Sequence, residues 1–360
     1  GLVGSEMCIR DRTETSLLTI DHYFELASVS DPQISPEGAW IAYTVSRSNL
    51  EEEKSRSRVW LVPADGGDAV AMTSKKESSS HPRWSPDGKY LAFLSARNDG
   101  QTQVWTLYRQ GGEAVQLTDT AQSVNAFEWS PDGKRMLLLL KDPTPQELAA
   151  KEQGEDYEEE TKPPWVIDRR QFKEDYIGYL DRRRTHIHVL DIESGRISQL
   201  TSGDYDDSQP AWSPDGKSIA FTSNRTENPD SNYNTDIWRV SADPEQAHAS
   251  LVQVTDTEGA DSSPAWSPDG KFITHTSVTR PEVIDYAFSH LAVSPSKGGS
   301  TRVLTADLDR MIFSPEFTAD GGHILFLLED SGEQNLARIK TGGGEVERLV
   351  RGQNVVRAFN

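Results

Sequence analysis

Aspartates are the most regularly repeated groups in this chain that could carry out acid–base chemistry. Asp87, Asp132, Asp215 and Asp269 each occupy the third position of a Ser-Pro-Asp-Gly motif. Two catalytic carboxylates have to flank one bond, whereas equivalent positions of a repeat are spread over the whole molecule. In this motif proline presets φ, aspartate tolerates the third position and glycine supplies a positive φ. We therefore predict that the four aspartates form turns and no catalytic centre.

The sequence also contains no recognisable nucleophile motif and no complete set of metal ligands. No Gly-x-Ser-x-Gly nucleophile elbow occurs in the 360 residues. His186 and His188 share one face of an expected strand, but no third metal ligand accompanies them. Residues 230–236 begin like a calcium loop, yet Thr235 stands where that loop needs glycine, and Ser241 where it needs glutamate. The residues predict a solvated loop there, and no catalytic residue, metal site or cofactor in the chain.

The aspartate turns belong to a unit that is repeated along the chain. Ser-Pro-Asp-Gly or a near variant begins at residues 35, 85, 130, 213, 267 and 318. Apolar segments flank each copy, and a third strand, a glycine turn and a short fourth strand follow, as in Gly111-Gly112 and Gln116-Leu117-Thr118. Four strands in each repeat, without a helical period between them, are typical of a propeller blade. We predict an all-β fold, a β-propeller with six four-stranded blades and the first strand of a seventh.

The repeats divide the chain into blades at about residues 29–78, 79–122, 123–206, 207–260, 261–310 and 311–353, with the next blade beginning at 354–360. Residues 13–28 form a lead-in segment, and an insert at 142–184 interrupts the third blade. Residues 1–12, which contain the only cysteine, Cys8, resemble a translated sequencing adapter, so we expect them to be foreign to the protein. Because the repeat stops within a copy, we expect the sequence to be a fragment.

A ring that lacks a blade should expose one side of its first and last blades. The sequence therefore predicts partial exposure of six apolar side chains there, Ile34, Trp40, Tyr43, Phe313, Phe317 and Phe326.

Charge and hydropathy exclude two classes of partner. The formal net charge of −20 repels phosphate backbones, so we expect no nucleic-acid partner. Arginines cluster once, at 182–184, where neighbouring carboxylates predict local ion pairs on a solvated loop. No apolar run approaches the roughly 18 residues that a membrane-spanning helix needs, so we expect no membrane partner.

The blades with Trp-Ser-Pro-Asp-Gly-Lys and Gly-Gly turns resemble TolB-type, WD40-like repeats. Residues 18–360 as a whole resemble the N-terminal propeller of prolyl oligopeptidase family serine peptidases, in the acylaminoacyl-peptidase and dipeptidyl-peptidase branch. The lead-in through Val29-Ser30-Asp31-Pro32 and the insert at 169–180 favour this family over TolB alone. The resemblance implies a C-terminal α/β-hydrolase domain that carries Ser, Asp and His, and that domain is absent from these 360 residues.

The resemblance also implies where a substrate would bind. In dipeptidyl-peptidase relatives, glutamates of the propeller bind the free amino group of the substrate. The matching candidates lie in the insert, with an arginine and a tyrosine as partners for a carbonyl or carboxylate: Glu158, Glu159, Glu160, Glu174, Arg169 and Tyr176. The alternative is a solvated acidic helix that makes no substrate contact.

Two functions follow as expectations. The first is the gating domain of a serine peptidase that admits short peptides to the missing hydrolase domain, in a full-length enzyme that could form a homo-oligomer. A periplasmic or otherwise exported location is slightly favoured over the cytoplasm. The second is a stand-alone TolB-like propeller that binds protein partners.

Overall fold

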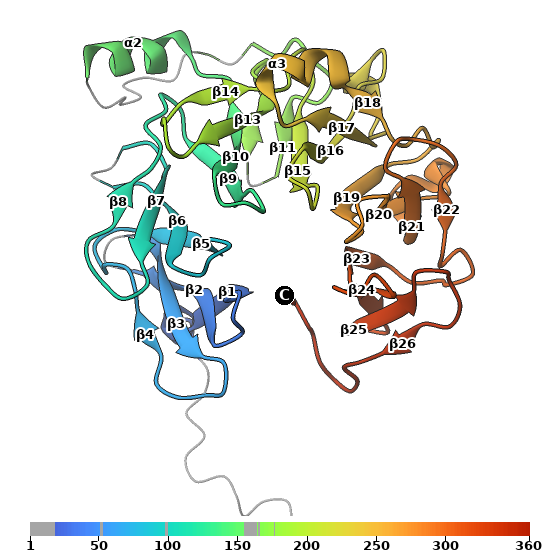
Figure 1. Cartoon of the computed structure of the whole chain (residues 1–360), viewed down its shortest axis with the longest axis horizontal. Helices are drawn as coiled ribbons and strands as arrows, with labels where there is room; N and C mark the ends of the chain where they lie inside the picture. The colour runs from blue at the N-terminus through green and yellow to red at the C-terminus, as the bar shows by residue number, and fades with distance from the viewer. Residues whose placement is uncertain (1–18, 51–52, 98–99, 155–163, 165, 176) are drawn as a thin grey trace, which may run out of the picture.

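A computed structural model describes residues 19–50, 53–97, 100–154, 164, 166–175 and 177–360. Six antiparallel four-stranded sheets are arranged around a common axis, with the first strand of each sheet innermost (Figure 1). Consecutive strands of each sheet pair side by side, because short turns connect antiparallel neighbours. The predicted β-propeller with six four-stranded blades is confirmed.

The first three blades are formed by residues 27–199. Blade one contains β1 (Ala27–Ile34), β2 (Trp40–Asn49), β3 (Lys54–Pro63) and β4 (Val70–Ala71). Blade two contains β5 (Ser79–Trp84), β6 (Tyr90–Ser95), β7 (Gln103–Tyr108) and β8 (Val115–Gln116). Blade three contains β9 (Val124–Trp129), β10 (Arg135–Lys141), β13 (Thr185–Asp191) and β14 (Ile197–Gln199).

The last three blades repeat this order. Blade four contains β15 (Asp207–Trp212), β16 (Ser218–Ser223), β17 (Asp236–Ser241) and β18 (Val252–Gln253). Blade five contains β19 (Asp261–Trp266), β20 (Phe272–Val278), β21 (Ser289–Pro295) and β22 (Arg302–Val303). Blade six contains β23 (Ile312–Phe317), β24 (His323–Asp330), β25 (Glu333–Lys340) and β26 (Glu347–Arg348).

Helices are short and lie outside the sheets. They are α1 (His22–Glu25), α2 (Pro145–Gln153) and α3 (Pro244–Ala247), and the 3-10 helices η1 (Pro229–Ser231), η2 (His248–Ser250) and η3 (Pro281–Tyr286). A small hairpin, β11 (Lys173–Glu174) and β12 (Gly178–Tyr179), lies with α2 in the segment between β10 and β13. Among the described residues, no helix combines the length and apolar character that crossing a membrane requires.

The Ser-Pro-Asp-Gly turns have the local chemistry that the sequence predicts. In blade two, Ser85 Oγ donates to Asp87 Oδ1 over 2.7 Å, and the same oxygen accepts from the backbone N of Lys89. Hydrogen bonds from Ser85 and Lys89 lower the pKa of Asp87 to about 2. Gly88 closes the turn with φ +67°, where a side chain would be strained. The repeated aspartates therefore hold turns.

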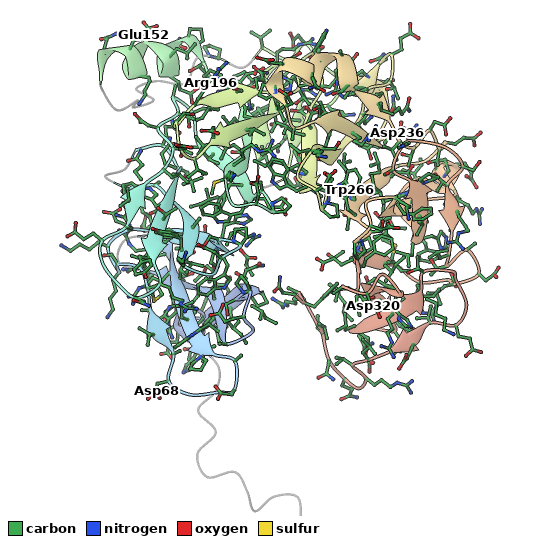
Figure 2. All side chains as sticks on the ribbon, in the orientation of Figure 1. Asp68, Glu152, Arg196, Asp236, Trp266 and Asp320 are labelled. Atoms are coloured by element: carbon green, nitrogen blue, oxygen red, sulfur yellow. The ribbon has the colours of Figure 1, made fainter. Side chains whose placement is uncertain are left out.

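Tryptophans at the ends of the first strands join neighbouring blades. In four successive pairs of blades, the indole Nε1 donates to a backbone carbonyl in the first strand of the preceding blade: Trp84 to Gln33 (3.1 Å), Trp129 to Arg83 (3.3 Å), Trp212 to Glu128 (3.3 Å) and Trp266 to Ala211 (3.1 Å). Figure 2 shows Trp266 on the inner side of the ring. Blade six has Phe317 at this position, and phenylalanine has no donor.

The ring is open between blades six and one, and residues 354–360 run across the opening (Figure 1). The expected opening strand of a seventh blade takes the form of a single parallel bridge between Val355 and Gln334. At the other end of this segment, Asn360 Oδ1 accepts from the backbone N of Ile34 over 2.9 Å. The C-terminal segment therefore contacts both the last blade and the first.

Five of the six apolar side chains predicted to be partly exposed are so. Ile34 is 44% exposed, and Trp40, Tyr43, Phe313 and Phe317 are half-buried. The prediction for Phe326 is wrong, because this ring is completely buried. It packs with Leu291 and Val293 of blade five, so it points away from the opening.

Candidate functional site

The segment between β10 and β13 is the insert that the sequence singled out, and it begins with α2. Thr144 caps this helix: its Oγ1 accepts from the backbone N of Glu147 over 3.0 Å, while the Glu147 carboxylate accepts from the backbone N of Thr144. The capping box and Gly154 at the C-terminal end explain why the helix spans only nine residues. Figure 1 shows α2 at the outer edge of the ring.

The insert is attached to blade four through Asp230. This carboxylate accepts hydrogen bonds from Arg169 Nε (3.2 Å) and from the backbone N of Gln171 (3.0 Å). Gln171 Nε2 in turn donates to the carbonyl of Asn232 (3.1 Å). Partial burial opposes the ionised form, but the backbone hydrogen bonds and the Arg169 charge outweigh it and lower the pKa of Asp230. The loop that begins like a calcium loop therefore holds the insert.

The structure places two of the six substrate-binding candidates. Arg169 is directed to Asp230 and to the carbonyl of Asp181, with only 8% of its side chain exposed. Glu174 lies in the first strand of the small hairpin, and its side chain is exposed. Glu158, Glu159, Glu160 and Tyr176 lie outside the described residues. The structure thus brings Arg169 to a carboxylate of the protein itself.

The arginine cluster at 182–184 differs from the sequence expectation in one respect. Its ion pairs are present: Arg183 pairs with Asp181 (2.8 Å), and Arg184 pairs with Asp204 (2.7 Å) and Asp206 (2.8 Å). Arg184 is not solvated, however, because only 7% of its side chain is exposed. Its guanidinium lies against blade four, where the two aspartates of the preceding loop compensate its charge.

Of the two histidines of β13, His186 lies between blades three and four. His186 is buried, with Nδ1 3.6 Å from Asp207 and Nε2 3.8 Å from Asp142. Burial lowers the pKa of His188 to about 4, which keeps that ring neutral. Within the described parts of the chain, no group of three or more His, Cys, Asp or Glu side chains is arranged to hold a metal ion.

One face of the ring carries large apolar side chains that are exposed. In every antiparallel sheet of this order, the connection between the second and third strands leaves from the same end, so these connections share one face. They expose Leu50 (58%), Val166 (83%), Tyr233 (78%), Ile284 (70%) and Tyr286 (87%). The Ser-Pro-Asp-Gly turns leave from the opposite end. These side chains come from four of the blades, and they make this face the candidate interaction surface.

A family model supplies the deciding observation. The N-terminal region of dipeptidyl peptidase IV matches residues 146–283, which extend from α2 of the insert through blade four into blade five. The chain is a β-propeller, and over this stretch it is similar to a propeller of peptidase-family proteins. The resemblance that its blades and insert show is confirmed.

The propeller has curated relatives that are named as peptidases. It is 33% identical over 222 residues to the uncharacterized peptidase YuxL of Bacillus subtilis, covering 62% of this chain and 33% of that protein. It is 27% identical over 356 residues to dipeptidyl-peptidase 5 of Porphyromonas gingivalis, covering 94% and 50%. The chain thus spans a third to a half of the length of these relatives.

A solved structure shows the same fold. The acylaminoacyl peptidase of Pyrococcus horikoshii superposes with a TM-score of 0.69 at 19% identity, over 92% of this chain and 47% of that one. At this identity the likeness shows the β-propeller fold and no more.

Sequence reasoning misses two residues that the structure makes prominent. Asp230 stands out in the sequence only as part of an imperfect calcium loop, since nothing local indicates a partner 61 residues away in the insert. Arg97 follows β6 and stacks on Trp105 at 3.9 Å, and its local sequence gives no sign of this contact. The comparison of blades gives the one hint, because Ser79 of blade two stands where blade four has Asp207, the ion-pair partner of Arg225.

Proposed function

We propose that this chain is the substrate-gating propeller of a serine peptidase that acts on short peptides. In this proposal, catalysis belongs to an α/β-hydrolase domain outside these 360 residues, and the propeller supplies shape and one wall of the substrate pocket. A ring of blades excludes folded proteins by size and leaves short peptides to react. The match to the dipeptidyl peptidase IV N-terminal region and the peptidase relatives support this function.

The observation that carries the proposal is the exposed apolar face. Tyr233 and Tyr286, which are 78% and 87% exposed, come from two successive blades and lie on the face from which the insert also leaves. Exposing large aromatic side chains to water is unfavourable, by roughly 25 cal/mol for each Å² of apolar surface. A catalytic domain that covers this face would bury them and would place the insert beside its active site.

The insert is the proposed source of substrate contacts. Glu174 is exposed on this side and is free to meet an amino group, whereas Arg169 is already paired with Asp230. We therefore assign Arg169 to positioning the insert, and we propose Glu174, with Glu158, Glu159, Glu160 and Tyr176, for substrate contact.

The product of the complete gene tests this function. Translation beyond Asn360 should reveal an α/β-hydrolase domain with a Gly-x-Ser-x-Gly elbow, and the purified enzyme should cleave chromogenic dipeptide substrates but no folded protein. Tyr233→Asp combined with Tyr286→Asp should weaken the contact between the two domains and lower kcat/KM.

The matched control is Tyr90→Asp, a tyrosine at the opposite end of the blades that is 44% exposed. A gene that ends shortly after a further blade would refute the proposal and favour the stand-alone protein-binding propeller. Equal losses in the face variant and the control would show that the apolar face has no special role.

A further inference from the structure

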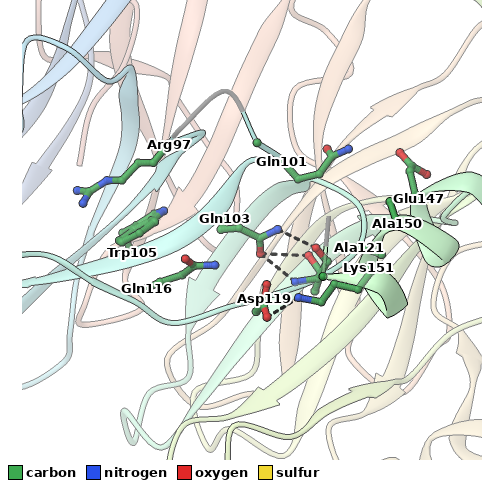
Figure 3. A pocket seen from close by; sticks show the side chains of 13 residues that line it. Arg97, Gln101, Gln103, Trp105, Gln116, Asp119, Ala121, Glu147, Ala150 and Lys151 are labelled. Carbon is green, nitrogen blue, oxygen red and sulfur yellow. Dashed lines mark hydrogen bonds and ion pairs between the residues drawn. The ribbon is translucent and has the colours of Figure 1, made fainter. Parts of the chain in front are cut away.

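A cavity of about 400 Å³ lies between blade two and α2 of the insert (Figure 3). Arg97, Trp105 and Gln116 line it from blade two, and Glu147 and Lys151 line it from α2. This volume lies within the range of small-molecule sites. The cavity therefore has room for a ligand of the size of a short peptide.

Arg97 is the unusual group in its wall. Its guanidinium carbon lies 3.9 Å from the centroid of the Trp105 ring, and its Nε is buried without a hydrogen-bond partner. Among the described residues, Arg97 forms no ion pair within 4.0 Å. Burial lowers the pKa of Arg97, and only the charge of Glu77 acts in the opposite direction. A stacked and partly desolvated cation without a bound anion is an unusual arrangement in a protein.

In blade four the arginine at the same position is compensated by a carboxylate. Arg225 follows β16 as Arg97 follows β6, and it also lies over a tryptophan, at 5.6 Å from the Trp238 ring. Arg225 Nη2, however, pairs with Asp207 Oδ1 over 2.7 Å. The strand registers make Ser79 of blade two equivalent to Asp207, since Ser79 pairs with Ser95 as Asp207 pairs with Ser223. Blade two has the arginine and the tryptophan but a serine where blade four has the carboxylate.

The other described charges around the cavity are already paired. Lys151 forms an ion pair with Asp119, and Glu147 pairs with Arg183 over 3.3 Å. Among the described residues of the wall, one net positive charge is therefore left, at Arg97. Gln116 donates its Nε2 to the carbonyl of Thr118, so its Oε1 is left to accept a hydrogen bond.

We propose that this cavity binds the carboxylate group of a short peptide, with Arg97 as its hydrogen-bond donor and Trp105 as the support of the guanidinium face. A guanidinium that is stacked on one face still presents its N–H edge, which matches both oxygens of a carboxylate. The amides of Gln101 and Gln116 suit the peptide backbone beside it. The carboxylate is supplied by the C-terminus of the peptide or by an acidic side chain. This binding does not depend on the gating role.

Calorimetric titration of the 360-residue chain at low ionic strength tests the site with three acetylated tripeptides. Trialanine with a free C-terminus should bind, its C-terminal amide should not, and an Ala-Glu-Ala amide reports whether a side-chain carboxylate suffices. Arg97→Gln should lower the affinity at least about tenfold, the usual effect of losing a charge-assisted pair. The control is Arg196→Gln, an exposed arginine in the turn before β14, which should bind as the unaltered chain does.

Ser79→Asp keeps the proposal testable if Arg97→Gln does not fold. It supplies the carboxylate that blade four has, so it should abolish peptide binding while leaving the melting temperature unchanged or higher. Asp99 lies outside the described residues, and Asp99→Asn should leave binding unchanged. The proposal is overturned if the unaltered chain binds neither carboxylate peptide, if folded Arg97→Gln binds as well as the parent, or if binding appears only in Asp99→Asn.

Discussion

The indole Nε1 of Trp212 donates a hydrogen bond over 3.3 Å to the backbone carbonyl of Glu128, 84 residues earlier and in the preceding blade. Three further tryptophans make the equivalent contact, so the propeller is joined by a repeated side chain-to-backbone bond as well as by apolar packing. The bond depends on a single donor atom, which makes its contribution measurable.

Trp212→Phe should lower the free energy of unfolding by about 1 kcal/mol more than Trp60→Phe does. Both changes remove the same volume, but Trp60 Nε1 is buried without a hydrogen-bond partner, so its loss removes no bond. Urea denaturation of the two variants and the parent provides the comparison. Equal destabilisation by the two changes would mean that the aromatic side chain of Trp212, and not its N–H donor, accounts for its contribution to stability.

Asp207→Asn should destabilise the propeller by about 3 kcal/mol, because the carboxylate is fully buried and compensates Arg225, whose side chain is only 7% exposed. Its removal leaves a buried cation unpaired. Lys89→Ala breaks the pair with Asp87, where both side chains are more than half exposed, and should cost less than about 1 kcal/mol. Chemical denaturation measures the free energy of unfolding of both variants. Similar losses of stability would contradict the conclusion that burial makes the Asp207 pair the more important one.

Asp230→Ala should release the insert without unfolding the blades. The carboxylate bonds to Arg169 and to the backbone at residue 171, and the sheets keep their own hydrogen bonds without it. We expect faster hydrogen exchange and faster limited proteolysis over residues 166–181, with a melting temperature within a few degrees of the parent. Asp168→Ala, which removes an ion pair with Arg182 that is half-exposed on both sides, is the control. Unchanged exchange in Asp230→Ala would refute the role of this carboxylate in holding the insert.

Asp236 should make stability depend on pH between about 4 and 6. Burial, and then the neighbouring charge of Asp261, raise the pKa of Asp236 to about 6 from an ordinary value of 3.8. Because the folded chain holds this proton more tightly than the unfolded chain, its ionisation is destabilising. The free energy of unfolding should therefore fall as the pH rises through this window, relative to Asp236→Asn. Parallel curves of urea midpoint against pH for the two proteins would contradict the assignment.

The features whose causes are local could be predicted from the sequence. Each Ser-Pro-Asp-Gly turn is made by residues a few positions apart, as the bond between Ser85 and Asp87 shows, so the repeat alone indicates six blades. The insert is recognisable in the same way, as an interruption between two strands of one repeat. The charge and the absence of a nucleophile elbow are also properties of the chain itself.

Contacts between groups that are distant along the chain could not be predicted, because they depend on how the blades pack. Arg169 has the charge and hydrogen-bond donors that a substrate carboxylate would need. In the structure, however, its guanidinium is already paired with Asp230, which is 61 residues away. Phe326 is buried and not exposed, because the side of blade six from which it projects packs on blade five. Arg97 and Arg225 hold the same position in two blades, and the residue on the neighbouring strand, serine or aspartate, decides whether the cation is compensated. Such pairings arise from strand register and blade packing, which bring together residues that are distant along the chain.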